Sequence, residues 1–428
     1  MSKQNILTSI IALIPLSYIL GNFILNLNIL FIILGGLTLY IKGHRIKLIF
    51  LDKLILVFFS FIIFTGTWNT IESYYFINIE NHDFSIIIKS ILFLRYLILY
   101  FAIRLFLEKD LINFKIIFFV YAALSSFVIL DIIIQFYLGK NIFGLTSPFV
   151  HKRTGIFYTE AIAGGFIQKF SLFLFFTFAV YSKIKNIKIK ISLLTLFLFL
   201  AVLSIIFSGN RMPLILFLLG IFLIFIQNKS LKKYFLYIAI STILLFIVSI
   251  SSSSHLKNYY LKFYDSSKEI FSLYTYRITG VGNDLNFKDR PVYVHEFDSG
   301  IGTWKLNKFI GGGLKAFRYN CPKRQIKSIN ERTTCNIHPH NYYLEILADL
   351  GIVGILLFIL IIFLTYKQTY KFLNNEKIKY TISPFFYIFL LEIFPIRSSG
   401  SFFTTNNAIF FFLALSVIIG LSEKIKER

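Results

Sequence analysis

The sequence predicts an all-α protein, a polytopic transmembrane helical bundle of about twelve spans with one large loop domain. The first observation is the composition. Of 428 residues, 56% are hydrophobic and only 15% are charged, whereas soluble domains carry about 25% charged residues. The second observation is that apolar runs of roughly 20 residues, the length that crosses a bilayer, recur along the chain. Together they exclude a disordered chain, a disulfide scaffold and an ordinary cytosolic enzyme.

Successive apolar runs define the expected spans. In chain order they cover residues 6–20, 23–41, 48–66, 86–107, 112–138, 161–181, 191–207, 212–226, 234–250, 344–364, 380–394 and 402–421. Asn22, Asn26 and Asn28 lie around the junction of the first two runs, which form either two helices or one broken element. No small-residue cleavage site follows the first run, so a cleavable signal peptide is not expected.

Lysines and arginines orient these spans, because the cytoplasmic loops of membrane proteins are enriched in them. If the N-terminus is cytoplasmic, the basic clusters of the short loops fall on the cytoplasmic side, and so does the C-terminus. These clusters are Lys42, Arg45 and Lys47; Lys183, Lys185, Lys188 and Lys190; Lys229, Lys232 and Lys233; Lys367, Lys371, Lys377 and Lys379; and Lys424, Lys426 and Arg428. The net charge of +23 is therefore mainly a topology signal, and nucleic acid is not an expected partner.

One large outer segment, residues 251–343, separates two expected transmembrane regions. These are residues 1–250, with about nine helices, and residues 344–428, with about three. The segment has 93 residues, with 14 Lys and Arg against 7 Asp and Glu. A loop this long does not follow the orientation rule. Its positive charge indicates either a site for an anionic ligand at the outer membrane surface or an ordinary solvated basic surface.

Both cysteines, Cys321 and Cys335, lie in this outer segment. The expected topology puts them on the oxidising side of the membrane, where a disulfide is favoured. Two free thiols that never meet are the alternative. Two cysteines without a matching Cys/His pattern do not indicate a metal site.

A tight outer turn, Ser208-Gly209-Asn210-Arg211-Met212-Pro213, joins two expected spans. Ionisable residues in membrane segments often mark functional sites, and Arg211 is held between two apolar runs. The alternative is an arginine that snorkels to the lipid headgroups. A snorkelling arginine requires neither the Gly-Asn turn before it nor the proline after it, so the sequence favours a functional Arg211.

The segment His338-Pro339-His340-Asn341 immediately precedes the tenth expected span. Histidine is suited to general-base chemistry near neutral pH, and Asn341 is a candidate for orienting it or for binding a hydroxyl group. Two histidines separated by proline make a weak metal site without a third ligand, so no metal is expected. Gly351 and Gly354, which lie one helical turn apart, allow close helix packing.

Two further polar clusters lie at the outer ends of spans. Arg153-Thr154-Gly155 with Glu160 stands before the sixth span, and Arg397-Ser398-Ser399-Gly400-Ser401 follows the eleventh. Arg153 and Glu160 form either a structural ion pair or part of a site. The Arg397 cluster is either a polar turn between two spans or a contact for the substrate.

The outer segment carries scattered candidates for binding. They are Arg290 within Asp289-Arg290-Pro291, His295-Glu296, Trp304 and Gly311-Gly312-Gly313. A glycine-rich turn can present backbone N–H groups to phosphate, and an aromatic ring such as that of Trp304 can stack on a sugar. No P-loop, dinucleotide-binding fingerprint or Ser-x-x-Lys motif is present, and no cofactor is expected.

Around His340 the chain resembles a known family. His340-Asn341, nine residues, and then Gly351-Ile352-Val353-Gly354 is similar to the H-[NSQ]-x9-G-x-x-G motif of the bacterial O-antigen ligase and O-antigen polymerase superfamily. Further motifs resemble that family in order and spacing over most of the chain: Arg153-x-Gly155 with Glu160 and Gly164, Ser208-Gly209-x-Arg211, Gly311-x-Gly313 before Cys321, Cys335 before the histidine motif, and Pro395-x-Arg397 through Phe402.

The resemblance implies a membrane glycosyltransferase that works without metal on the periplasmic face of the bacterial inner membrane. Its donor is a glycan on undecaprenyl pyrophosphate. Ligases of the family pass the glycan to the lipid A core, and polymerases pass it to another lipid-linked repeat unit; the motifs are shared, and we expect a ligase.

The resemblance also implies roles for particular residues. His340 activates the acceptor hydroxyl, and Arg211 holds the donor pyrophosphate with a second loop arginine, for which Arg290 is the best match. Other candidates for substrate contacts are Arg153, Glu160, Trp304, His338, Asn341 and Arg397.

The residue types agree with this chemistry. Departure of a lipid pyrophosphate develops negative charge, which fixed arginines stabilise, and a weakly nucleophilic hydroxyl benefits from a positioned base. A transporter or lipid flippase is the rival from another class of protein. It would place charged or broken helices at mid-membrane, whereas the polar residues here gather at one face and in one outer loop.

Overall fold

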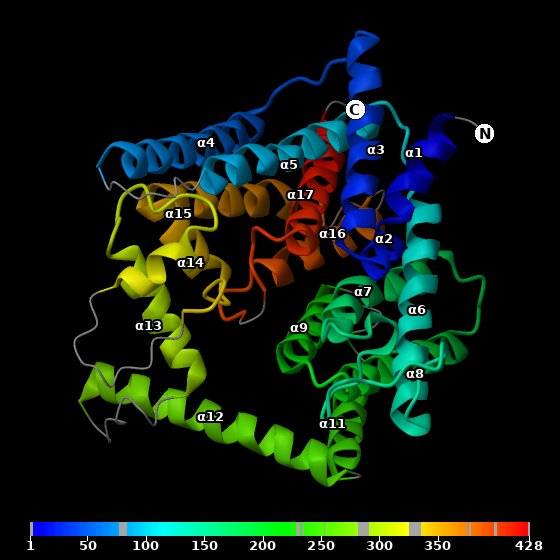
Figure 1. Cartoon of the computed structure of the whole chain (residues 1–428). Helices are drawn as coiled ribbons and strands as arrows, with labels where there is room; N and C mark the ends of the chain where they lie inside the picture. Colours follow the sequence, from blue (N-terminus) through cyan, green and yellow to red (C-terminus); the bar gives the residue numbers. More distant parts are fainter. Residues whose placement is uncertain are drawn as a thin grey trace. The chain divides into compact units, whose positions relative to one another are not determined.

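The computed structural model describes residues 3–76, 84–227, 232, 235–251, 253–280, 291–324, 335–373, 375, 378–397 and 400–426. Over these ranges the chain is helical and has no strand, which confirms the predicted all-α class (Figure 1). The chain divides into two compact units. The first comprises Met1–Ile32, Lys109–Phe263 and Asn375–Leu391; the second comprises Ile33–Glu108, Tyr264–Asn374 and Glu392–Arg428.

The first unit is built around α6 (Phe114–Leu138) and α7 (Ala163–Tyr181), which pack along each other. Tyr121 of α6 makes edge-to-face contacts with Phe170 and Phe173 of α7, with ring centroids 5.3 and 4.8 Å apart. Such pairs stabilise the core beyond the apolar area that they bury. The other helices of this unit are α1 (Lys3–Ala12), α2 (Ile14–Leu20), η1 (Gly155–Phe157), α8 (Ile187–Phe207), α9 (Arg211–Gln227), α11 (Phe235–Ser251) and most of α16 (Lys379–Glu392).

The N-terminal apolar runs form separate helices. The first run is α1 and α2, and the second is α3 (Asn22–Ile41). Gly21 separates α2 from α3 with a φ of +102°, a backbone conformation that favours glycine. Asn28 of α3 donates a hydrogen bond to the Ser17 hydroxyl of α2 at 2.9 Å, so the amide nitrogen of this buried asparagine is satisfied within the pair.

The second unit joins helices that lie far apart in the sequence. In it α5 (Ser85–Glu108) packs against both α4 (Phe50–Phe76) and α17 (Thr405–Lys426), and α15 (Tyr342–Tyr370) packs against α4 and α17. Phe59, Phe93 and Phe412 meet in this core, with ring centroids 5.2 to 6.0 Å apart. The outer segment adds α13 (Val292–Trp304), α14 (Phe317–Asn320) and η3 (Cys321–Lys323). The helix α12 (Ser254–Thr279) belongs partly to each unit.

Seven helices among the described residues are long and apolar enough to cross a membrane, which supports a membrane protein. They are Asn22–Ile41, Phe50–Glu72, Ser85–Glu108, Phe114–Leu138, Lys188–Phe207, Tyr342–Tyr370 and Thr405–Lys426. An eighth span arises if Ala239–Ser251 and Leu256–Tyr276, bent by 114°, are counted as one. The expected spans at 6–20, 161–181, 212–226 and 380–394 correspond to shorter apolar stretches or helices. The count of twelve therefore stays a prediction.

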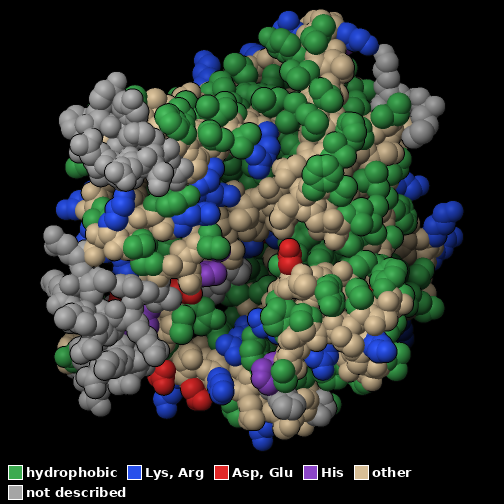
Figure 2. All heavy atoms as spheres, in the orientation of Figure 1, with side chains coloured by type: hydrophobic (Ala, Val, Ile, Leu, Met, Phe, Trp, Pro, Cys, Tyr) green, Lys and Arg blue, Asp and Glu red, His purple; other side chains and the backbone are tan. Residues whose placement is uncertain are grey.

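Apolar side chains also cover much of the surface. Figure 2 shows hydrophobic side chains over a large part of the visible face. On α3 alone, Phe23, Leu30, Phe31 and Leu34 are exposed. Contiguous apolar surface of this kind marks a lipid or protein contact rather than a water-facing surface.

Candidate functional site

The histidine motif lies at the start of α15, where Asn341 caps the helix. Its side-chain oxygen accepts hydrogen bonds from the backbone N–H groups of Tyr343 and Leu344 at 2.9 and 3.2 Å. Its amide nitrogen donates to the carbonyls of Pro395 and Arg397 at 2.8 and 3.2 Å. Both ends of the amide are therefore engaged with backbone groups, and Asn341 anchors the motif to the connection between α16 and α17.

His340 has an unusual backbone and an accessible side chain. Its φ of +51° lies in the left-handed region, which non-glycine residues rarely adopt outside strained or functional positions. One third of its side chain is exposed. Burial lowers the pKa of His340. The neutral imidazole, the form that accepts a proton, therefore predominates near pH 7.

Glu296 of α13 faces this histidine. Its Oε1 atom lies 3.8 Å from Nε2 of His340 and accepts a hydrogen bond from Asn336 at 3.3 Å. The Glu296 side chain is 12% exposed, and burial raises its pKa to about 7. The structure thus pairs an imidazole whose pKa is lowered by burial with a carboxyl group whose pKa burial raises to about 7.

His338 packs against His340, with ring centroids 4.3 Å apart. Burial and the positive charges of His340, Arg318 and Lys315 lower the pKa of His338 to about 4. Neither ring nitrogen has a hydrogen-bond partner among the described residues. His338 is therefore a neutral, enclosed imidazole at physiological pH.

Basic side chains gather near His338. We call Lys89, Arg95, Lys315 and Arg318 the cationic cluster. Burial lowers the pKa of Lys315, Glu345 raises it, and Arg318, Arg95 and Lys89 lower it further, so the four cations interact electrostatically. Lys89 also donates to the hydroxyl of Tyr319, the residue after Arg318, at 3.3 Å. Nε of Arg318 is enclosed without a hydrogen-bond partner in the described parts of the chain.

Two acidic side chains that interact electrostatically with Lys315, Asp349 and Glu345, accept hydrogen bonds from other groups. Asp349 accepts the backbone N–H groups of Lys315 and Phe317 at 2.7 and 3.1 Å. Glu345 accepts the Ser401 hydroxyl at 2.5 Å and the Phe402 N–H at 2.7 Å. Within the described residues, no ion pair joins either carboxylate to Lys315 or Arg318. Lys315 and Arg318 therefore present cationic donors without an ion pair in the described structure, the arrangement that attracts an anion.

The Gly311–Gly313 turn has a structural role. The N–H groups of Gly312 and Gly313 donate to the carbonyls of Ala348 and Asp349 at 3.1 and 2.8 Å, so they are engaged with protein and not directed to a phosphate. Gly351 interrupts α15 with a φ of +66°, where a Cβ would lie 2.3 Å from the carbonyl oxygen of Phe309. Gly351 is thus a break in the helix that receives the turn, whereas close helix-to-helix packing was expected for it.

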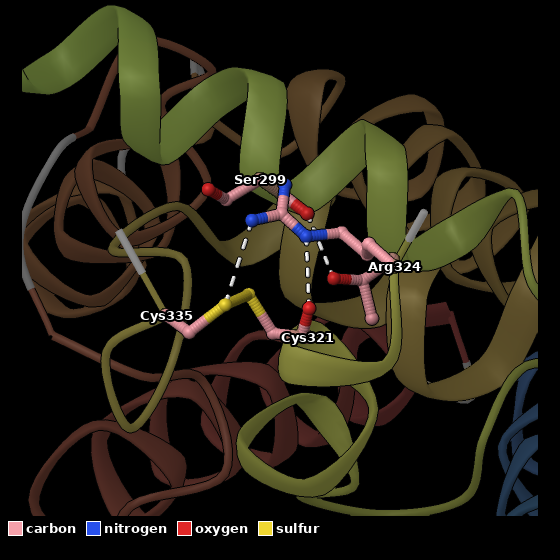
Figure 3. Close-up of a disulfide and its surroundings, with 5 residues drawn as sticks. Ser299, Cys321, Arg324 and Cys335 are labelled. Carbon is pink, nitrogen blue, oxygen red and sulfur yellow. Dashed lines mark hydrogen bonds between the residues drawn. A yellow bond between two sulfur atoms is a disulfide. The ribbon is translucent and has the colours of Figure 1, made fainter. Parts of the chain in front are cut away.

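A disulfide joins Cys321 and Cys335, the pairing expected from the sequence. Figure 3 shows Arg324 beside the bond. Its Nε donates to the Cys321 carbonyl at 2.9 Å, and Nη2 lies 3.5 Å from the Cys335 sulfur. Arg324 therefore contacts both cysteines of the disulfide.

Two other predicted site residues of this unit make internal contacts. Arg397 is only 5% exposed. Its Nη1 lies 2.9 Å from Oε2 of Glu392, and its guanidinium stands 4.9 Å from the Tyr342 ring centroid. Trp304, at the end of α13, is half-buried and donates its indole N–H to the Lys308 carbonyl at 3.0 Å.

Arg211 lies in the first unit, as the first residue of α9. Its Nη2 donates to the Tyr259 carbonyl at 2.6 Å, and its guanidinium stacks on the Tyr259 ring at 3.7 Å. Nε is enclosed without a hydrogen-bond partner in the described ranges. The pKa of nearby Lys152 is lowered, mainly by burial and in addition by the positive charge of Arg211. The tight turn before Arg211 is held by Asn210, which accepts the Gly164 N–H at 3.0 Å and donates to the Ala161 carbonyl at 2.9 Å.

Arg153 and Glu160 also belong to the first unit, and they do not form the ion pair that was one reading of the sequence. The Arg153 guanidinium contacts the carbonyls of Val150 and Lys152 at 3.4 Å, and Glu160 is exposed. Arg290, predicted as the second pyrophosphate arginine, lies outside the described residues.

Three residues of the site were given no specific role from the sequence: Lys315, Arg318 and Glu296, the last of which was noted only as part of His295-Glu296. Each stood in the basic outer segment, but no spacing rule connects them with His340, which is 44 positions beyond Glu296. Among the described residues, no group of three or more His, Cys, Asp or Glu side chains is arranged to hold a metal ion.

Comparison with known proteins gives one match. Residues 196–359 match the family model described as O-antigen ligase, and this range contains Arg211, the disulfide, the cationic residues of the loop and the histidine motif. No curated protein matches the sequence. The family comparison confirms, over residues 196–359, the resemblance of this chain to the O-antigen ligase and O-antigen polymerase superfamily.

Proposed function

We propose that the protein transfers a glycan from an undecaprenyl-pyrophosphate carrier to a sugar hydroxyl, as an O-antigen ligase. The observation that carries the proposal is the position of His340, a partly exposed imidazole that packs against His338, which in turn feels the positive charges of Lys315 and Arg318. A base and an anion site are the two parts that such a transfer needs.

The proposed reaction breaks the bond between the sugar carbon and the pyrophosphate oxygen. The pyrophosphate leaves with the electron pair, and the cationic cluster stabilises the charge that develops on it. The acceptor oxygen bonds to the sugar carbon and passes its proton to His340. Arg211 is proposed as a further donor of hydrogen bonds to the pyrophosphate, and Arg290 remains a sequence-based candidate for the same task. No step requires a metal ion.

The proposed location follows from the basic clusters of the short loops. Both termini lie in the cytoplasm, residues 251–343 lie in the periplasm, and about twelve spans cross the inner membrane. Cysteine-labelling from each side tests this arrangement. A cysteine placed at Lys305 should react with a membrane-impermeant reagent in intact spheroplasts, and one at Lys371 should react only after lysis.

Reconstituted transfer tests the function itself. The purified protein, with chelator present, should move glycan from the lipid-linked donor to lipid A core. His340→Ala should abolish transfer and leave donor binding largely intact, because it removes the base and no cation. Near-normal transfer by His340→Ala, or loss of wild-type transfer on chelation, would contradict the proposal.

A polymerase is the alternative, because both activities are associated with the same motifs. A deletion strain separates them. Loss of all long-chain lipopolysaccharide with accumulation of lipid-linked polymer indicates a ligase, whereas a core that carries a single repeat unit indicates a polymerase. A transporter is the remote alternative, and it would move lipid-linked glycan across vesicles without forming a new glycosidic bond.

A further inference from the structure

One contact in the second unit has no assigned role, namely that between Glu296 and His340. Oε1 of Glu296 lies 3.8 Å from Nε2 of His340, although the two residues belong to different elements. Neither ring nitrogen of His340 has a hydrogen-bond partner among the described residues. Glu296 is therefore the only acidic neighbour that an ion-pair distance connects to this imidazole in the described structure.

The packing of α13 holds this contact in place. Glu296 and Gly300 are four residues apart and so share one face of the helix. A Cβ on Gly300 would lie 3.1 Å from the side chain of Leu344 and 3.4 Å from that of Pro339, the residue between the two histidines. The absence of a side chain at Gly300 lets α13 approach the histidine motif closely, and this brings Glu296 to His340.

We propose that Glu296 is a positioning residue that orients His340 and compensates the charge that His340 gains when it accepts a proton. The proposal rests on the proposed function and deepens it, since it supplies the base with a partner. With Nε2 directed to Glu296, Nδ1 is the nitrogen that faces the acceptor.

The proton balance of the step is simple. The acceptor hydroxyl loses its proton to Nδ1 of His340 as its oxygen bonds to the sugar carbon and the pyrophosphate departs with its electron pair. The imidazole becomes an imidazolium, and the Glu296 carboxylate beside Nε2–H offsets its charge. After the transfer, His340 returns the proton to water.

Other charged groups near Glu296 do not explain its state. The elements packed against α13 are α14, η3 and α15, and α13 itself carries His295 and Asp298. The charged or titratable groups of α14, of η3 and of the first turns of α15, together with those of the motif, are Arg318, Tyr319, Lys323, Arg324, His338, Tyr342, Tyr343, Glu345 and Asp349. Burial is the cause of the raised pKa of Glu296, which lies at about 7.

Glu296→Gln is the decisive substitution, because it keeps the shape of the side chain and removes the titrating carboxyl. We expect kcat of reconstituted transfer to fall about tenfold or more, as general-base assistance contributes roughly 10²–10⁴, with KM for the donor unchanged. The acidic limb of the kcat profile should move to lower pH, because the carboxylate that stabilises the protonated imidazole is lost. Glu296→Asp should retain more of kcat than Glu296→Gln does. Asp298→Asn, which removes a carboxylate from the same helix, should change neither kcat nor KM.

A second measurement keeps the inference separate from the proposed function. The ring carbons of ¹³C-labelled histidine report the titration of His340 by NMR in detergent, with His340→Gln used for assignment. Glu296→Gln should shift this titration to lower pH, whether or not the protein transfers glycan. An unchanged titration of His340, or wild-type kcat with an unchanged pH profile, would overturn the role of Glu296. Absence of transfer by the wild-type protein would overturn the proposed function alone.

Discussion

Cys335, three residues before His338, is bonded to Cys321, whose side chain is fully buried beside Phe317 and Ala348. Ala348 belongs to α15, the helix that the histidine motif begins. The bridge therefore fastens the entry of the motif to the packed part of its own helix, and it limits how far the two histidines can move from Glu296.

Removing the bridge should loosen the site. Cys335→Ser is expected to lower the free energy of unfolding by about 2–4 kcal/mol, since the bond constrains the unfolded chain between the two cysteines. Transfer should fall in parallel, and a reducing agent should have the same effect on the wild-type protein. Thermal unfolding in detergent and transfer, each with and without reductant, measure both. Two free thiols in protein quenched directly from the periplasm would contradict this prediction.

Gly351 provides a second test, at the break in α15. Gly351→Ala should destabilise the protein by about 2 kcal/mol or more, because the backbone there is left-handed and the new Cβ would meet the Phe309 carbonyl at 2.3 Å. Gly165→Ala is the matched control, since nothing lies within 4 Å of a Cβ at that helical position. It should change the free energy of unfolding by less than about 1 kcal/mol. Equal melting temperatures for the two variants would contradict the role of the break.

The sequence predicted the parts of this fold that depend on long apolar runs. The helix after Asn341 is an example, because the apolar run at 344–364 marks it, whereas the capping of this helix by Asn341 was not predicted. The number of spans was harder to predict, because hydropathy does not reveal where a run is interrupted. The first run contains a helix break near Leu13, and α9 holds only 17 residues.

The site was predicted only in part, for a physical reason. His340 could be identified because a single local motif carries it. Glu296 could not, since its contact with His340 depends on how α13 packs through Gly300, and no local pattern encodes that packing. Gly351 was identified as a special position but for the wrong reason, because a glycine that permits close packing and one that permits a left-handed backbone look alike in sequence.

The cationic cluster predicts where the donor is held. The double variant Lys315→Gln/Arg318→Gln should raise the donor KM about tenfold or more, because each charge-assisted hydrogen bond contributes roughly 1.5–3 kcal/mol. Lys323→Gln removes an exposed lysine of the same segment and should leave KM unchanged. Transfer kinetics at two ionic strengths provide the measurement. An unchanged KM in the double variant, with normal melting temperature, would place the pyrophosphate elsewhere.

At Arg211, donor binding and transfer should depend on the shape of the side chain as well as on its charge. Arg211→Ala should weaken donor binding and transfer, and Arg211→Lys should rescue both poorly, because an ammonium cannot reproduce the planar fork that binds a pyrophosphate or the stacking on Tyr259 at 3.7 Å. Loss of the hydrogen bond to the Tyr259 carbonyl would also loosen the start of α12, so a structural effect must be measured separately.

Tyr259→Phe is the control variant for this structural effect. It removes the hydroxyl that donates to the Gly209 carbonyl at 2.8 Å and keeps the ring under the guanidinium. If Arg211 binds the donor, Tyr259→Phe should retain transfer, while Arg211→Lys should lose it at an equal melting temperature. Equal transfer by the two variants would leave Arg211 with a structural role alone.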